Sequence, residues 1–141
     1  MNWTIDFTKE FSRGAKILKK RYRSFLHDLE SFKESIKENP FQGVELVPGI
    51  RKIRMEIKAK SKGKSGGARV ITLTYYISQI EGKVHFLIIY DKSDADTVDV
   101  NVVKEQVEEL GFNLTELNNK GLLTKIEDTN TEDSEKDPNR T

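Results

Sequence analysis

The sequence predicts an α+β fold, in which an N-terminal antiparallel helical hairpin packs on a small antiparallel sheet of three to four strands. Two patterns support this prediction. Apolar residues recur at helical spacing between positions 9 and 39. Between positions 50 and 91, one segment alternates in two-residue steps and two more are rich in β-branched and aromatic residues. The length of 141 residues suits a single domain with a buried core.

The N-terminal segment is expected to form a short strand followed by the first helix. Residues 3–7 alternate between apolar and polar side chains, as a half-buried strand does, and Thr8 stands at the N-cap position of a helix. The apolar face of this helix carries Phe11, Ala15 and Leu18. Its outward face is basic and carries Lys9, Arg13, Lys16, Lys19 and Lys20.

The second helix is expected to run from a cap at Ser24 to about Asn39. Its apolar face is formed by Phe25, Leu29, Phe32 and Ile36. Pro40 ends the helix because proline cannot continue helical hydrogen bonding, and residues 41–49 are predicted to be a connecting loop. Because only a short turn separates the two helices, they are predicted to pack as an antiparallel hairpin.

Three strands are predicted after this loop, at residues 50–58, 68–77 and 84–91. Glu81 and Gly82 are expected to form the tight turn between the second and third strands. Residues 59–67 are glycine-rich and charged, so they are expected to lack regular structure. Simple alternation along the third strand places Tyr90 and Lys92 on the same face as Phe86, with His85 on the opposite face.

The C-terminal part is predicted to contain one short helix and a tail. Asp99 or Asn101 begins the helix and Gly111 closes it, so residues 1–111 are expected to be the main domain. The sequence assigns no definite structure to the extension at residues 112–126. Residues 127–141 hold six acids, two bases and no apolar residue, a composition that predicts a disordered acidic tail.

The composition argues against several classes of protein. Without cysteine the chain has no disulfides and no thiolate metal ligands, and its two histidines, His27 and His85, are far apart in the sequence. No apolar run reaches the roughly 20 residues of a membrane span, and no secretory signal pattern opens the chain. We therefore expect a cytoplasmic protein with no cofactor, no metal and no membrane partner.

Positive charge is concentrated in residues 48–70, which hold eight Lys or Arg against one acid, although the whole chain has a net charge of only +1. A solvated strand face with a surface loop would account for this segment without any further function. Gly63-Lys64-Ser65 resembles the end of a phosphate-binding P-loop, but the first glycine of that motif would fall at Lys58 and a strand follows, so this interpretation is rejected. The third interpretation is a polyanion site, with nucleic acid as the obvious ligand.

A polyanion site would combine a strand face with the basic loop. Lys52, Arg54 and Lys58 project from one face of the predicted strand. Residues two positions apart on that face, such as Lys52 and Arg54, lie about 7 Å apart, which is close to the spacing of phosphates along a nucleic acid. The positive field is extended by Arg51, Lys60, Lys62 and Lys64. Contacts of this kind supply affinity and salt dependence but read no sequence.

Three further residues are candidates for the same site. Arg69 directly follows Gly66-Gly67-Ala68, where its guanidinium can hold a phosphate in bidentate fashion. Tyr90 is either a core residue with its hydroxyl at the rim or a ring that stacks on an unpaired base, and Lys92 would supply a cation beside it. The aspartates Asp91, Asp94, Asp96 and Asp99 are interpreted as a turn and a helix N-terminus.

Two runs of residues carry a resemblance to a known family. They are G-I-R-K-I-R-M-E-I-K-A-K-S-K-G-K-S-G-G-A-R-V-I-T at 49–72 and I-I-Y-D-K-S-D-A-D-T-V at 88–98, and N-P-F-Q-G at 39–43 also fits. Over roughly residues 3–110 the chain closely resembles the RelE/ParE superfamily of bacterial toxins from type II toxin–antitoxin pairs. The resemblance implies a helical hairpin on an antiparallel sheet and a cognate antitoxin as protein partner. It also implies either mRNA cleavage on the ribosome, as in RelE-like members, or inhibition of DNA gyrase by binding, as in ParE-like members.

For a RelE-like activity the resemblance implies a metal-independent attack of the ribose 2′-OH on the neighbouring phosphate. Lys52 or Arg54 would accept the proton, Arg69 would stabilise the transition state, and Lys92 would bind the phosphate or act as the acid. The tyrosine of RelE falls where this chain has Val98, so Tyr90 would take its place as the stacking group.

The leading expectation is a ribosome-dependent mRNA endonuclease. A gyrase inhibitor and a nucleic-acid-binding family member without catalysis are the alternatives. Arg69→Ala is expected to remove toxicity with little loss of stability.

Overall fold

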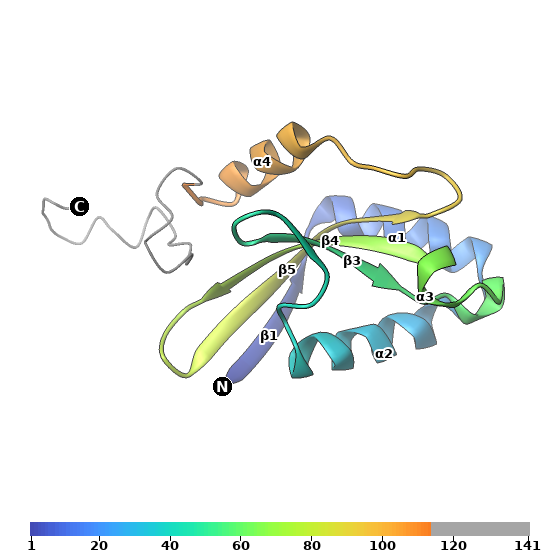
Figure 1. Cartoon of the computed structure of the whole chain (residues 1–141), viewed down its shortest axis with the longest axis horizontal. Coiled ribbons are helices and arrows are strands. Elements are labelled where there is room, and N and C mark those ends of the chain that lie inside the picture. The colour runs from blue at the N-terminus through green and yellow to red at the C-terminus, as the bar shows by residue number, and fades with distance from the viewer. Residues whose placement is uncertain (114–141) are drawn as a thin grey trace, which may run out of the picture. The chain divides into compact units, whose positions relative to one another are not determined.

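The computed structural model describes residues 1–113 (Figure 1), and the chain divides into one unit of residues 1–98 and a second unit that begins at Asp99. The first unit has a mixed α/β fold with a five-stranded sheet. Its strands are β1 (Asn2–Phe7), β2 (Val44–Val47), β3 (Ile50–Met55), β4 (Ala68–Tyr76) and β5 (Glu81–Asp91). The order across the sheet is β1-β5-β4-β3-β2.

The sheet differs from the prediction in size and in strand direction. It has five strands instead of three or four, and β1 pairs in parallel with β5, so the sheet is mixed and not antiparallel. The additional strand, β2, lies within residues 41–49, which were predicted to be a loop. With only four residues at the edge of the sheet, β2 is too short for an alternating pattern that would reveal it.

The turn between β4 and β5 is longer than predicted. β4 ends at Tyr76 and β5 begins at Glu81, so Glu81 and Gly82 belong to the strand and not to the turn. The N–H groups of Ile77 and Ser78 donate to the Glu81 carbonyl at 2.8 and 3.1 Å, which closes this turn.

The two helices of the N-terminal segment, α1 (Lys9–Arg21) and α2 (Phe25–Glu38), pack on one face of the sheet. The ring of Phe86 on β5 contacts both, with centroid distances of 5.3 Å to Phe11 on α1 and 5.5 Å to Phe32 on α2. The Thr8 hydroxyl accepts a hydrogen bond from the Phe11 N–H at 3.0 Å, which confirms the predicted cap. The positions of both helices are as predicted, whereas their packing on each other as a hairpin stays a prediction.

Ser24 occupies the N-cap position of α2 but makes no cap hydrogen bond. Its hydroxyl instead donates to the Asp28 carboxylate at 2.6 Å and accepts from the Ala59 N–H at 2.9 Å. Asp28 also accepts from the Lys58 N–H at 3.0 Å. The first turn of α2 therefore holds the beginning of the segment between β3 and β4, residues 56–67, which is called the basic segment below.

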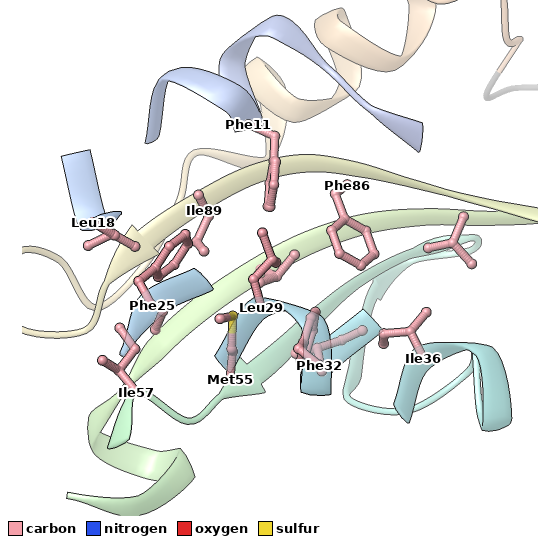
Figure 2. Close-up of a cluster of buried hydrophobic side chains, with 14 residues drawn as sticks. Phe11, Leu18, Phe25, Leu29, Phe32, Ile36, Met55, Ile57, Phe86 and Ile89 are labelled. Atoms are coloured by element: carbon pink, nitrogen blue, oxygen red, sulfur yellow. The ribbon is translucent and has the colours of Figure 1, made fainter. Parts of the chain in front are cut away.

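Apolar side chains from both helices and from β3, β4 and β5 form one core, part of which is drawn in Figure 2. The core contains Phe11, Leu18, Phe25, Leu29, Phe32, Ile36, Ile53, Met55, Ile57, Ala68, Val70, Val84, Phe86 and Ile89. Each large apolar side chain buried in this way stabilises the fold by roughly 1.5–3 kcal/mol. The helical members are the apolar stripes that the sequence predicted, so the core determines which face of the sheet the helices cover.

A β-bulge at Leu87 reverses the side-chain alternation of β5, because the pairing with β4 skips this residue. Phe86 and Ile89 consequently both join the core beneath the helices. Tyr90 therefore points to the opposite face of the sheet. The prediction that Tyr90 and Lys92 share a face with Phe86 is wrong, because an inserted residue leaves no mark in a simple alternating pattern.

The basic segment between β3 and β4 contains two short helical turns, η1 (Lys58–Lys60) and α3 (Gly63–Gly66), where irregular structure was predicted. The segment returns very close to β3 at Gly67. A Cβ atom there would lie 2.1 Å from the Met55 carbonyl oxygen, so only glycine fits. This close approach lets the segment pack as local structure instead of projecting as a free loop.

The second unit contains α4 (Val100–Glu109), which begins at Asp99 as predicted. The Asp99 carboxylate accepts a hydrogen bond from the Asn101 N–H at 2.9 Å. Apart from Phe112 and Asn113, the predicted extension at 112–126 and the predicted tail at 127–141 lie outside the described residues. Within residues 1–113, no helix combines the length and apolarity that crossing a bilayer requires.

Candidate functional site

Cationic side chains from separate strands meet on the sheet face opposite α1 and α2. The strand register places Arg54 of β3 beside Arg69 of β4, and Arg69 beside Tyr90 of β5, in one row across the sheet. Lys52 lies two residues before Arg54 and shares its face. Lys92 follows β5, where its N–H donates to the Gly67 carbonyl at 3.0 Å. Strand pairing thus gathers charges that are far apart in the sequence.

These side chains line an open groove of about 670 Å³. Among the described residues, its wall contains five cationic side chains and one carboxylate. The lining residues are Gln42, Gly43, Val44, Lys52, Ile53, Arg54, Lys64, Arg69, Lys92 and Asp96. The excess of positive charge attracts anions. Of the five residues predicted to be catalytic, Lys52, Arg54, Arg69 and Lys92 are brought together here.

One wall of the groove comes from the loop before β2. Gly43 has a φ of +89° and lies so close to β3 that a Cβ would be 2.5 Å from the Lys52 carbonyl oxygen. The side-chain amide of Gln42 donates to the carbonyls of Ser35 at 3.2 Å and Asn39 at 3.1 Å, which holds the loop against the end of α2. Sequence reasoning missed this wall because no local pattern shows which strand a loop will lie against.

Arg69 supports the groove as well as lining it. Only 6% of the residue is exposed. Its guanidinium donates to the carbonyls of Ser65 at 2.9 Å, Ala68 at 3.2 Å and Lys64 at 3.4 Å, and so joins α3 to the start of β4. These contacts change what we expect of Arg69→Ala. The substitution would loosen the turn that carries Lys64, so its effect on stability would not be small.

Asp91, at the end of β5, anchors the basic segment on the helix side of the sheet. Its buried carboxylate accepts hydrogen bonds from Lys60 Nζ at 2.5 Å and Tyr22 Oη at 2.5 Å. Arg21 Nη1 donates to the same carboxylate at 2.8 Å. The Lys60 side chain is only 5% exposed, and it does not line the groove. Lys60 was predicted to contact RNA, but its ammonium is held in this buried ion pair.

The protonation of Asp91 gives a prediction about acid stability. Burial alone would raise the pKa of Asp91, but hydrogen bonds from Lys60 and Tyr22 hold it well below its ordinary value of 3.8. Because the folded-state pKa is depressed, this carboxylate stabilises the fold fully above its unfolded pKa, and the contribution is lost as the pH falls below about 4. We expect the free energy of unfolding, measured with urea, to fall from about pH 5 to pH 2. The fall should be shallower in Asp91→Asn, and equal slopes in the two proteins would contradict this role.

Asp96 is the single carboxylate in the groove wall within residues 1–113, and it forms a salt bridge with Lys92. The Asp96 side chain is 81% exposed, so it meets any ligand that enters. The hydrogen bond from Lys92 lowers the pKa of Asp96, and the charges of Arg69 and Lys52 act in the same direction. Asp96 is therefore an internal counter-ion of the groove. The sequence showed it only as one of four closely spaced aspartates.

Two residues of the basic segment lie at or beside the groove, and a third is exposed outside it. Lys64 lines the groove and also a smaller hollow of about 120 Å³ next to it. Lys58 lines only this second hollow, together with Arg54. Lys62 is exposed and lines neither of the two. The positive field predicted for this segment is thus divided between the groove, the adjoining hollow and open solvent.

Arg51 is directed away from the groove. Its guanidinium donates to the Phe41 carbonyl at 2.7 Å and lies 3.6 Å from the Glu45 carboxylate. Arg51 therefore secures the loop before β2. Its predicted contact with RNA has no counterpart in the groove wall, because neighbouring residues of a strand point to opposite faces.

Tyr90 lies beside Arg69 in the cross-strand row but does not line the groove. Its hydroxyl is buried and has no hydrogen-bond partner among the described residues. Burial raises the pKa of Tyr90, and the charge of Arg69 opposes this effect. His85, expected on the opposite face, shares the face of Tyr90 because of the bulge, and its Nε2 lies 3.2 Å from Tyr75 Oη. A stacking role for Tyr90 stays a prediction.

In the part of the chain that the structure describes, no group of three His, Cys, Asp or Glu side chains is arranged to hold a metal ion. Comparison with protein families and with curated proteins finds no matching family model and no matching sequence. The groove and the sequence resemblance described above are therefore the two indications of what this protein does.

Proposed function

We propose that this protein is the toxin of a type II toxin–antitoxin pair and that it cuts mRNA on the ribosome without a metal ion. The observation that carries the proposal is the convergence of Lys52, Arg54, Arg69 and Lys92 in one groove. These are the basic positions that the resemblance to RelE-like toxins implies for the reaction. Their meeting on one sheet face supports a common role.

The groove suits the backbone of a nucleic acid better than a small anion. β2 pairs with β3 only as far as Lys52, so Arg54 lies on an unpaired part of the β3 edge, where it lines both the groove and the adjoining hollow. A strand of RNA can pass along such an edge, and successive phosphates can meet cations from different strands. Binding of this type is driven by the release of counter-ions from the nucleic acid, so it weakens strongly as the salt concentration rises.

In the proposed reaction the ribose 2′-oxygen bonds to the adjacent phosphorus, and the bond from phosphorus to the 5′-oxygen of the next nucleotide breaks. The 2′-OH loses a proton, and the leaving 5′-oxygen gains one. Because arginine is not deprotonated in proteins, Lys52 is the better proton acceptor of the Lys52–Arg54 pair. Arg54 and Arg69 stabilise the negative charge that develops on the phosphate oxygens. Lys92 binds the phosphate or protonates the leaving oxygen.

The ribosome has a defined part in this scheme. A groove built mainly from lysine and arginine binds RNA without fixing the reacting atoms, so free RNA should be cut poorly. The ribosome would position the mRNA and so supply the proximity effect. In well-oriented reactions this effect lowers the activation free energy by about 7–11 kcal/mol.

The test is brief expression of the protein in growing bacteria, with mRNA 5′ ends and plasmid supercoiling measured in the same samples. The proposal predicts new 5′ ends inside translated codons and unchanged supercoiling. Relaxed or broken DNA with intact mRNA would indicate gyrase inhibition instead. Intact mRNA together with intact DNA would indicate a family member that only binds nucleic acid.

Asp96→Asn should strengthen the binding of a non-cleavable RNA severalfold. The substitution removes the repulsion between this exposed carboxylate and the RNA phosphates, and it releases Lys92 to the phosphates. Fluorescence anisotropy at fixed salt measures the change. Asp94→Asn is the matched control, because Asp94 pairs with Arg21 outside the groove wall. Weaker binding by the Asp96 variant would show that this carboxylate positions Lys92 for the ligand.

A further inference from the structure

A second cationic surface lies on α1. The helix carries six basic residues and one acid, Glu10. Four of the basic residues form a single row along the outer face, since they are spaced by four, three and four positions. This α1 row consists of Lys9, Arg13, Lys16 and Lys20, all of them exposed. It spans about 16 Å at the helical rise of 1.5 Å per residue.

The charges of the α1 row are not neutralised by the fold. Within residues 1–113, none of the four forms a salt bridge, and the nearest acid of β1, Asp6, is bound to Lys83 at 3.0 Å. Beside the row lies an open hollow of about 320 Å³, whose lining includes Lys9, Arg13 and Lys16. A concentration of unpaired like charges destabilises a helix slightly. Lys20, in the last turn, is favoured by the helix dipole, so this cost falls on Lys9, Arg13 and Lys16.

The α1 row and the groove face in opposite directions. Phe11 and Leu18 bury the inner face of α1 against the sheet, which leaves the row on the far side of the helix. Lys52, Arg54 and Arg69 lie on the other face of the same sheet. One short RNA strand in the groove cannot reach the row, so a polyanion that binds the row is separate from the strand in the groove.

We propose that the α1 row is a docking surface for the sugar-phosphate backbone of a structured RNA, separate from the RNA strand that the groove holds. Under the proposed function, on which this partner rests, the structured RNA is the ribosomal RNA that surrounds the bound mRNA. The row would then position the protein on the ribosome while the groove meets the message. Such contacts confer affinity and orientation and no sequence preference.

The chemistry of the α1 row favours RNA over a protein or a membrane. Tight protein interfaces depend on buried aromatic or aliphatic anchors. The row itself consists of Lys and Arg, and the large apolar side chains exposed beside it are Ile17 on α1 and Phe7 in the hollow, too few for the apolar centre of such an interface. Membrane-bound helices insert their apolar face, but Phe11 and Leu18 are already buried in the core. A phosphate backbone needs only regularly spaced cations, which the row supplies at one per helical turn.

The test compares two double variants with the same change of charge and residue type. Arg13→Gln/Lys20→Gln alters the row, and Arg23→Gln/Lys37→Gln alters two exposed residues outside it. Each protein is titrated with purified ribosomes, with a short RNA duplex and with a short non-cleavable single strand, over a range of salt concentrations. Melting temperatures verify that both variants are folded.

For ribosomes and for the duplex, log affinity falls as log salt concentration rises. In the row variant this dependence should be less steep by about 1.5, which corresponds to two lost phosphate contacts. Its affinity for both should fall roughly 10-fold near 0.1 M salt. Binding of the short single strand, which measures the groove, should stay unchanged. The control variant should match the wild type with all three probes.

Two outcomes would overturn the inference. If the salt dependence of the row variant equals that of the wild type for ribosomes and duplex, the row does not contact RNA. If the control variant loses as much affinity as the row variant, the effect is a general one of charge. The proposed function fails separately. If the row variant loses duplex binding while the wild-type protein neither binds ribosomes nor cuts mRNA, α1 is an RNA-docking surface of a protein with another activity.

Discussion

Replacing Lys52 and Arg54 together with glutamine is expected to lower mRNA cleavage at least about 100-fold and to abolish growth arrest. Single preorganised donors that stabilise a developing charge are typically worth factors of 10²–10³, and this pair would supply both a donor and the proton acceptor. Both side chains line the groove. Cleavage is measured on purified ribosomes programmed with a defined message.

The structure also predicts that this double variant stays folded. Arg54 is exposed and Lys52 half-buried, and neither belongs to the core. Substitutions at such positions usually change stability by about 0.5 kcal/mol or less. Arg23→Gln/Lys37→Gln removes the same two residue types outside the groove and should cut mRNA normally. Undiminished cleavage by the Lys52/Arg54 variant would show that the groove is not the catalytic site.

Asp91→Asn is expected to destabilise the protein by roughly 3–5 kcal/mol, the range for removing one partner of a buried ion pair. The amide group would face Lys60 Nζ and Tyr22 Oη, both of which donate to the carboxylate in the native protein. The buried ammonium of Lys60 would lose its counter-charge. Urea denaturation of the purified variant measures the loss, which is a large part of the typical 5–15 kcal/mol stability of a domain.

Two further variants separate this effect from a general effect of charge. Asp94→Asn removes the exposed partner of the same Arg21 and should cost about 1 kcal/mol or less. Adding Lys60→Met to Asp91→Asn removes the stranded ammonium and should restore part of the stability. If Asp91→Asn and Asp94→Asn cost the same, the buried network does not anchor the basic segment.

Much of the fold was predictable because it follows from local patterns. Phe11 and Leu18 on α1 repeat at helical spacing, and Thr8 supplies a cap that depends on neighbouring residues only. The second helix and the three central strands were found for the same reason. The face shared by Lys52 and Arg54 was also predictable, because alternation along β3 is uninterrupted.

Other features depended on contacts between distant segments. The parallel pairing of β1 with β5 joins residues about eighty positions apart, and no local pattern encodes it. The bulge at Leu87 moved Tyr90 to the face opposite Phe86, although the sequence of β5 reads as an ordinary strand. Lys60 is unable to contact RNA because its ammonium pairs with the buried carboxylate of Asp91, and this pairing depends on how distant segments pack.

By itself, the sequence of this protein determined its three longer helices, its central strands and the local excess of positive charge, because each of these depends on residues that are close together in the chain. Only the tertiary structure decided how that charge is used. Strand pairing brought Arg54 and Arg69 together in a groove, and a buried carboxylate bound Lys60. The physical reason is that alternation and helical spacing determine which way a side chain points, whereas packing between distant segments determines what it meets.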